Sequence, residues 1–245
     1  FFFKQKTAYE IYQCDWSSDV CSSDLWEVHY NKGVWLPQIG WWLDALRAQA
    51  RSFITHAHSD HADPVSLSAI MKASPEARLF GRAASIAVGV EAGIPDPRLQ
   101  HISVGDRSIP VRGLRQPSTD VAVDVVFADH SGDACGFVFS VGDGPRPFRL
   151  YVTGDTLHHP DLVSDATTGV DLLCVCINGR WGNMGAVEAA TLARALEARR
   201  VMPMHYGVMV DNDADPTTFL EALAKSGAIA EPKVLAIGES WLVSY

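Results

Sequence analysis

Residues 55–61 read THAHSDH and place three histidines and an aspartate within six positions. The preceding run RSFITH, residues 51–56, is typical of a buried strand, so His56 and His58 lie two apart on extended chain and point the same way. Asp60 and His61 follow where the chain turns toward a helix. Three imidazoles and a carboxylate are costly to bury side by side unless a cation organises them. This stretch therefore predicts a metal site.

The elements around this stretch alternate between strands and helices. Asp63 and Pro64 open the first helix, because aspartate caps a helix N-terminus and proline fits its first position. We expect helices over residues 63–73, 82–93, 185–198 and 216–227. We expect strands over residues 27–30, 33–36, 39–45, 51–56, 77–81, 99–103, 108–114, 121–130, 136–142, 148–155, 170–178, 200–206, 233–238 and 240–245. Helices interleaved with this many strands predict an α/β fold in which two sheets carry helices on their outer faces.

The first 25 residues, FFFKQKTAYEIYQCDWSSDVCSSDL, have neither the helical nor the strand apolar period of a folded element. They also lack the features of a secretory signal. The runs KQKTAYEI and DWSSDVCSSDL can be spelled with codons that reproduce sequencing-library adapter DNA read in frame. We predict that residues 1–25 are an adapter-translation artefact. Residues 26–245 then form a single domain whose native N-terminal strand is shortened or replaced.

The remaining residues, 26–245, are acidic, with 18 basic and 25 acidic side chains. Nucleic acids and anionic membranes require clustered Lys and Arg, so we expect neither as a partner. No apolar run reaches the roughly 18–20 residues of a membrane span. Residues 26–245 contain three cysteines, Cys135, Cys174 and Cys176. A small, odd number of cysteines favours reduced thiols in a cytoplasmic protein. Cys174 and Cys176 alternate in an apolar run, and we expect them in the core rather than on a metal.

Three further candidate ligands follow apolar strand-like runs: His130 in FADHSG, Asp155 in YVTGDT and His205 in PMHYG. Each lies in or beside a glycine-containing turn, where loops collect functional groups on a rigid scaffold. With THAHSDH they amount to five imidazoles and two carboxylates, enough for two divalent ions. Nitrogen and carboxylate ligands without thiolate suit Zn²⁺, Mn²⁺ or Fe²⁺.

These residues resemble the signature of the metallo-β-lactamase superfamily, HxHxDH followed by a distal His, Asp and His, over essentially all of residues 26–245. The resemblance implies an αββα sandwich of two mixed β-sheets with helices on the outer faces. It implies a first metal site of His56, His58 and His130, a second of Asp60, His61 and His205, and Asp155 bridging both. The runs INGRWGNM and MPMHYG, with the TGDT strand end, resemble more narrowly the L-ascorbate-6-phosphate lactonase-like branch and its metal-dependent hydrolase relatives.

Two bound divalent ions, Zn²⁺ or Mn²⁺, imply a hydrolase. A water molecule between two cations becomes a hydroxide nucleophile near neutral pH, and the ions polarise the carbonyl or phosphoryl oxygen that is attacked. Asp60 is the expected catalytic residue, which orients the hydroxide and relays its proton. The expected partner is a small, anionic lactone, ester or phosphodiester, and the oligomeric state stays open, a homo-oligomer included.

Four residues are candidates for contacting that substrate: His158, Arg180, Asn183 and Tyr206. His158 closely follows the GDT turn, and Arg180 and Asn183 leave a strand end near the expected site. A guanidinium suits a carboxylate or phosphate. Tyr206 follows a proposed ligand and either donates to an oxyanion or packs.

Three other functions fit the sequence less well. A nuclease of the same superfamily would normally bring an inserted domain and a basic surface, and this chain has neither the length nor the charge for them. A redox di-iron protein needs an acidic residue in place of His58 and a flavin-binding domain. A non-catalytic metal-binding protein is expected where ligands have been lost, whereas all seven are present here.

Overall fold

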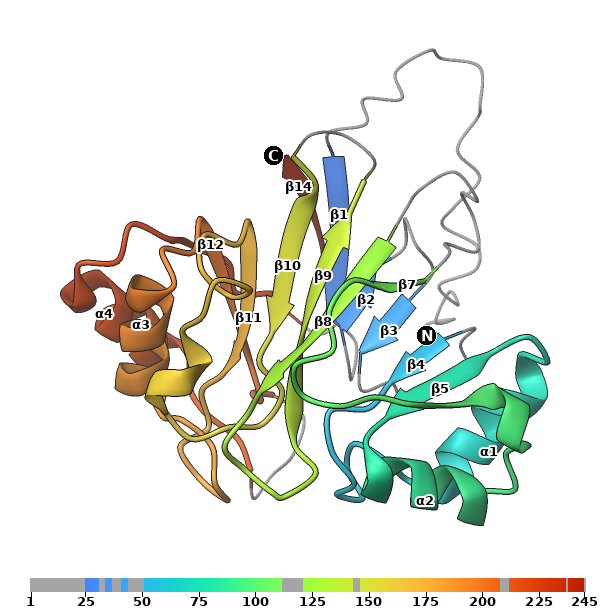
Figure 1. Cartoon of the computed structure of the whole chain (residues 1–245). Helices are drawn as coiled ribbons and strands as arrows, with labels where there is room; N and C mark the ends of the chain where they lie inside the picture. Colours follow the sequence, from blue (N-terminus) through green and yellow to red (C-terminus); the bar gives the residue numbers. More distant parts are fainter. Residues whose placement is uncertain are drawn as a thin grey trace, which may run out of the picture.

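Two seven-stranded β-sheets form the framework of the computed structural model, which describes residues 25–30, 34–36, 41–43, 51–111, 121–142, 146–207, 212–236 and 238–244 (Figure 1). The first sheet has the order β14 (Ser240–Ser244), β1 (Leu25–Tyr30), β2 (Val34–Leu36), β3 (Trp41–Leu43), β4 (Arg51–Phe53), β5 (Arg78–Gly81) and β6 (Leu99–His101). The second has the order β13 (Glu231–Pro232), β12 (Arg200–Met204), β11 (Leu172–Cys176), β10 (Phe148–Val152), β9 (Cys135–Val141), β8 (Val121–Phe127) and β7 (Ile109–Pro110). Both sheets mix parallel and antiparallel pairs.

The helices lie on the outer faces of the two sheets, as Figure 1 shows. On the first sheet, α1 (Pro64–Ala73) and α2 (Ala83–Glu91) bury Leu67, Met71 and Ile86 in one apolar cluster with β5 and β6. On the second, α3 (Ala186–Ala195) and α4 (Pro216–Ser226) bury Leu192 and Phe219 in the larger core cluster. Two short 3₁₀ turns, Asp96–Arg98 and Pro160–Leu162, complete the helical elements of the described residues. The predicted αββα sandwich is therefore confirmed.

An aromatic cluster fills the space between the sheets. Phe53 at the end of β4 stacks on Phe80 of β5, with ring centroids 4.6 Å apart. The same ring meets the edges of Phe137 and Phe139 of β9, with centroids 5.5 and 5.3 Å away. All four rings are buried, so β4 of one sheet is fixed against β9 of the other. This contact lies directly before residues 55–61 in the chain and positions them.

Local sequence signals set the helix ends. Asp63 caps α1 by accepting a hydrogen bond from the Ser66 main-chain nitrogen at 2.7 Å, and Pro64 is the first helical residue, as expected. Asp215 caps α4 through Thr217, and Gly227 closes that helix with a left-handed φ of 76°. Glycine accepts this conformation at little cost.

Several expected strands are shorter in the structure, and two of the differences bear on the site and on the sheet edge. The run 51–56 ends as a strand at Phe53, and beyond it the carbonyl of Thr55 accepts a hydrogen bond from the Cys135 nitrogen at the start of β9 in the opposite sheet. The expected strand 233–238 is wrong: the strand that pairs with β12 is Glu231–Pro232, two residues earlier.

Several predictions fall outside the described residues. Residues 1–24, most of the segment predicted to be an artefact, are among them, while Leu25 begins β1 opposite Ser244.

The described part of the chain has no helix that is both long and apolar enough to span a bilayer. Cys135, Cys174 and Cys176 are buried, and Cys174 and Cys176 lie in the core as expected.

Candidate metal centre

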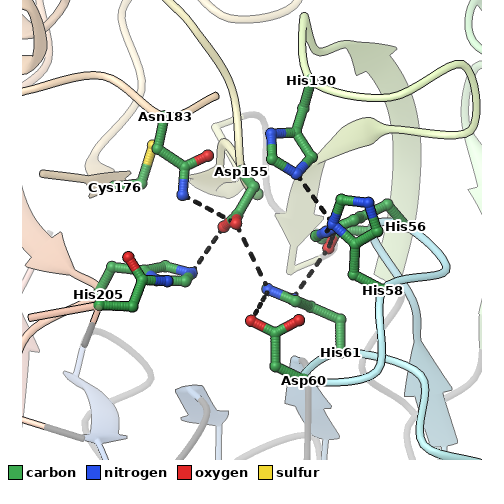
Figure 2. A network of polar contacts seen from close by, with 12 residues as sticks. His56, His58, Asp60, His61, His130, Asp155, Cys176, Asn183 and His205 are labelled. Carbon is green, nitrogen blue, oxygen red and sulfur yellow. Dashed lines mark hydrogen bonds and ion pairs between the residues drawn. The ribbon is translucent and has the colours of Figure 1, made fainter. Parts of the chain in front are cut away.

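The candidate ligands follow strands that end at the same edge of the sandwich. The HxHxDH stretch follows β4, His130 follows β8, Asp155 follows β10 and His205 directly follows β12. In the second sheet β8 is antiparallel to β9 and β9 to β10, while β10, β11 and β12 are parallel. The carboxyl ends of β8, β10 and β12 therefore share one edge, where the loop after β4 meets them. Figure 2 shows the labelled side chains converging there from separate loops.

His56, His58 and His130 form the first group of candidate ligands. Nδ1 of His58 lies 3.0 Å from Nε2 of His56 and 3.1 Å from Nε2 of His130. One nitrogen from each ring falls within 4.8 Å of the others. His56 is fully buried, whereas His58 is exposed, so the group opens toward solvent on one side.

The hydrogen bonds of this group fit a cation better than they fit neutral imidazoles alone. Nδ1 of His130 lies 3.0 Å from the carbonyl oxygen of Gly182, which only accepts, so the proton of a neutral His130 is on Nδ1 and its Nε2 carries a lone pair. Nδ1 of His58 has one hydrogen or one lone pair, so the two contacts it makes hold at most one hydrogen bond. A lone pair on one of these ring nitrogens is therefore left facing another ring nitrogen without a hydrogen bond between them. A divalent ion between the three nitrogens removes that conflict.

The second group surrounds the buried carboxylate of Asp155. Its Oδ1 lies 2.6 Å from Nε2 of His205, and its Oδ2 lies 3.6 Å from Nε2 of His61. Nε2 of His61 is also 3.5 Å from Oδ2 of Asp60, and one nitrogen of His56 lies within 4.8 Å of the His61 and Asp155 donor atoms. Asp155 thus contacts members of the second group and lies within 4.8 Å of one member of the first, His56.

Asp155 is ionised in this setting. Burial alone would raise its pKa, but hydrogen bonds and charge interactions with His205 and His61 outweigh burial and hold the pKa far below its ordinary value. Asn183 adds a further donor, with Nδ2 2.8 Å from Oδ2 of Asp155. The centre therefore presents a fixed negative charge beside a cluster of imidazoles, which is a donor set for Zn²⁺ or Mn²⁺.

The turn between β11 and α3, residues 179–185, holds ligands of both groups. Its Gly182 carbonyl accepts from His130, and its Asn183 amide donates to Asp155. Gly179, Trp181 and Gly182 all have left-handed φ values, of 63°, 55° and 83°. The turn is closed by a hydrogen bond from Gly179 to Met184 and fixed to the Asp155 loop by one from Met184 to Thr156. A conformation that costs energy at Trp181 is thus maintained beside the centre.

The loop that carries His130 is fixed at a second point. Asp133 accepts hydrogen bonds from the main-chain nitrogens of Ala84 and Ser85 at 3.1 and 3.0 Å and from the Ser85 hydroxyl at 2.7 Å. These donors lie in the first turn of α2, whose exposed N–H groups favour a carboxylate. Sequence reasoning did not find Asp133, although an acidic residue three positions after a candidate ligand was visible.

The four residues predicted to contact substrate are placed differently from one another. His158 and Arg180 are exposed. Asn183 is buried, and its amide is directed at Asp155 instead of solvent. The Tyr206 hydroxyl donates to the Leu235 carbonyl oxygen at 2.5 Å and accepts from the Leu235 nitrogen at 3.0 Å. For Tyr206, packing against the chain after β13 is thus the alternative that its contacts support.

Comparison with known proteins identifies the family of this chain. Residues 43–206 match the family model described as "Beta-lactamase superfamily domain". The chain belongs to the metallo-β-lactamase superfamily. A metallo hydrolase from Ignicoccus hospitalis, Igni18, shares the fold with a TM-score of 0.70 and 20% identity, covering 90% of this chain and 99% of its own.

Two curated relatives were found at higher identity. A protein of Symbiobacterium thermophilum named "UPF0173 metal-dependent hydrolase" is 28% identical over 198 residues, which is 77% of this chain and 79% of that protein. A protein of Opitutus terrae named "Probable DNA ligase" is 51% identical over 57 residues, which is 22% of this chain but only 6% of that protein. The chain therefore spans a small part of the second relative and most of the first.

Proposed function

We propose that this protein is a metal-dependent hydrolase that cleaves a small, anionic lactone, ester or phosphodiester. One observation carries the proposal: five imidazoles and two carboxylates converge at one sheet edge, with more ring nitrogens facing one another than hydrogens can satisfy. The proposed ligands of one divalent ion are His56, His58 and His130. Those of a second are Asp60, His61 and His205, with Asp155 shared. Zn²⁺ and Mn²⁺ both suit this set.

When bound, such ions lower the pKa of a water molecule and polarise the oxygen of the bond to be cleaved. The chain supplies the orientation. Asp60 lies at the edge of the centre, its side chain 28% exposed and its Oδ2 3.5 Å from His61, so its carboxylate can hold a water molecule and accept its proton. Asp155 and Asn183, both buried, fix the inner wall and keep it free of solvent.

Recognition of an anionic substrate is assigned to exposed groups beside the centre. Arg180 is exposed one residue from the 75%-exposed Trp181, in the turn whose Gly182 contacts His130. A guanidinium can pair with a carboxylate or phosphate, and an exposed indole offers an apolar surface next to it. His158 lies three residues after Asp155 and is exposed as well. Asn183 and Tyr206 are left out, because their donor groups are used within the fold.

The test begins with metal content. The full chain, purified in the presence of Zn²⁺ or Mn²⁺ and then desalted, should retain divalent metal by elemental analysis. It should then hydrolyse at least one member of a panel of lactones, phosphodiesters and acyl esters. His58→Ala should abolish that activity. His101→Ala, which changes an exposed histidine at the end of β6, is the matched control. Metal-free protein, or activity that survives His58→Ala, would refute the proposal.

A second candidate activity is cleavage of nucleic-acid phosphodiesters. The short stretch of 51% identity to the protein named "Probable DNA ligase" favours including nucleic acids among the substrates tested, although a ligase joins strands and does not cleave them. The overall charge of −9 opposes it, because nucleic-acid binding is dominated by contacts from Lys and Arg to phosphate. Single- and double-stranded oligonucleotides belong in the panel. Cleavage of these at rates above those of small phosphodiesters would favour the nuclease.

A further inference from the structure

Thr55, the residue before the first histidine, is buried between two proposed ligands. Its hydroxyl oxygen lies 3.1 Å from Nδ1 of His56 and 3.4 Å from Nδ1 of His61. Both imidazoles turn their other nitrogen, Nε2, toward the centre: that of His56 faces His58, and that of His61 faces Asp60 and Asp155. One hydroxyl therefore contacts the rear of a ligand from each group.

Hydrogen-bond chemistry allows both of these contacts to run in the same direction. A threonine hydroxyl has two lone pairs and one hydrogen, so it can accept from both Nδ1–H groups. In an ion-loaded centre, an imidazole whose Nδ1 carries the hydrogen has its lone pair on Nε2, which is the nitrogen that both rings direct inward. Metal-binding histidines commonly donate their second N–H to a fixed oxygen, and that oxygen sets tautomer and ring orientation.

The rest of Thr55 is fixed separately from the hydroxyl. Its carbonyl accepts from the Cys135 nitrogen at 2.9 Å, at the start of β9. Its methyl carbon would lie 3.0 Å from a Cβ added to Gly154, the residue before Asp155. Main chain and methyl group thus hold the oxygen in place against elements of the opposite sheet. They also allow the role of the oxygen to be separated from that of the methyl group by substitution.

We propose that Thr55 is a positioning residue whose single hydroxyl keeps His56 and His61 in the tautomer that presents Nε2 to both ions. The inference rests on the proposed metal centre. The inference goes further, because it assigns one oxygen atom to the coupling of the two metal sites. Loss of this oxygen should therefore weaken the binding of both ions and not of one alone.

The experiment compares Thr55→Val with Thr55→Ser in the full chain. Valine keeps the shape and removes the oxygen, whereas serine keeps the oxygen and removes the methyl group. Zn²⁺ affinity and stoichiometry are measured by competition with a chromogenic chelator, and unfolding temperatures are measured without metal. We expect Thr55→Val to weaken binding at both sites by about 10- to 100-fold, the loss typical for an outer hydrogen-bond partner of a ligand. Thr55→Ser should bind as wild type does.

Equal weakening by both substitutions, or wild-type binding by Thr55→Val, would overturn the inference. A direct measurement does not depend on the folding of a variant: long-range ¹H–¹⁵N spectra of the Zn²⁺-loaded wild type should show His56 and His61 protonated at Nδ1. Protonation of either ring at Nε2 would equally overturn it. If the wild-type chain binds no Zn²⁺ at all, the metal centre fails instead, which separates the two proposals.

Discussion

Gly182 offers a sharp test of how the centre is held, because its substitution acts on one proposed ligand. Its φ is 83°, and a Cβ built on it would lie 2.9 Å from Nδ1 of His130, the atom that donates to its own carbonyl oxygen. In Gly182→Ala the imidazole has to move away from the turn. Its Nε2 then leaves the position in which it faces His58.

Two other glycines separate this effect from ordinary backbone strain. Gly169 has a φ of 68° but nothing within 4 Å of an added Cβ, so Gly169→Ala carries the strain without the collision. Gly132 lies in the His130 loop with open space around it and no positive φ, so Gly132→Ala carries neither. A left-handed alanine costs about 1–2 kcal/mol. In a chain of this size that lowers the unfolding temperature by roughly 2–8 °C.

The expected pattern is therefore a difference between two assays. Gly169→Ala and Gly182→Ala should both lower the unfolding temperature measured by circular dichroism, and Gly132→Ala should leave it nearly unchanged. Only Gly182→Ala should also weaken Zn²⁺ binding, by about 10- to 100-fold, because a displaced ligand is lost from the first group. If Gly182→Ala and Gly169→Ala bind Zn²⁺ equally well, His130 is not held by this turn in the way the geometry indicates.

Three further outcomes are expected. Hydrogen bonds from Ser66 hold the pKa of Asp63 below its ordinary 3.8, so the cap stabilises α1 above about pH 4 and the stabilisation is lost as the pH falls; the unfolding temperatures of wild type and Asp63→Ala should differ at pH 7 and converge toward pH 3. Asp133→Ala removes the acceptor of three hydrogen bonds at the start of α2 and should cost about 1–2 kcal/mol in chemical unfolding, with Asp133→Asn intermediate. Tyr206→Phe leaves both main-chain groups of Leu235 without the hydroxyl and should cost about 1–3 kcal/mol in the same assay; an unchanged unfolding free energy would argue that the hydroxyl serves another purpose.

The sequence predicted best what depends on neighbouring residues. The Asp63–Pro64 helix start and the ligand spacing in THAHSDH are local, and the structure has the cap and the convergence that they indicate. The distal candidates were found because they follow strand-like runs beside glycine-containing turns, and the structure shows that the strands before them end at one edge. Polar residues close in sequence to the proposed ligands were harder to assign, because their hydrogen-bond partners depend on how distant segments of the chain pack together.

Asn183 and Tyr206 show why. Both follow strand ends near proposed ligands; Asn183 was expected to face a substrate, whereas for Tyr206 packing was left open beside that role. The left-handed turn of residues 179–185 instead directs the Asn183 amide inward to Asp155. At Tyr206 the preceding His205 has a φ of 62°, which breaks the strand alternation and lets the tyrosine reach Leu235. Positive φ at a residue other than glycine leaves no mark in the sequence, so neither outcome could be read from it.

The centre is assembled from both halves of the sandwich, and this links metal binding to folding. His56, His58, Asp60 and His61 follow a strand of the first sheet, whereas His130, Asp155 and His205 follow strands of the second. Without a cation, ring nitrogens of His56, His58 and His130 face one another, which opposes the close approach of the two sheet edges. Thr55, Gly182 and Asn183 maintain that approach through hydrogen bonds to the ligands themselves. Because these hydrogen bonds hold the ligands in place before an ion binds, part of the cost of ordering them is met during folding. The affinity of the centre for an ion therefore depends on residues that do not contact the ion.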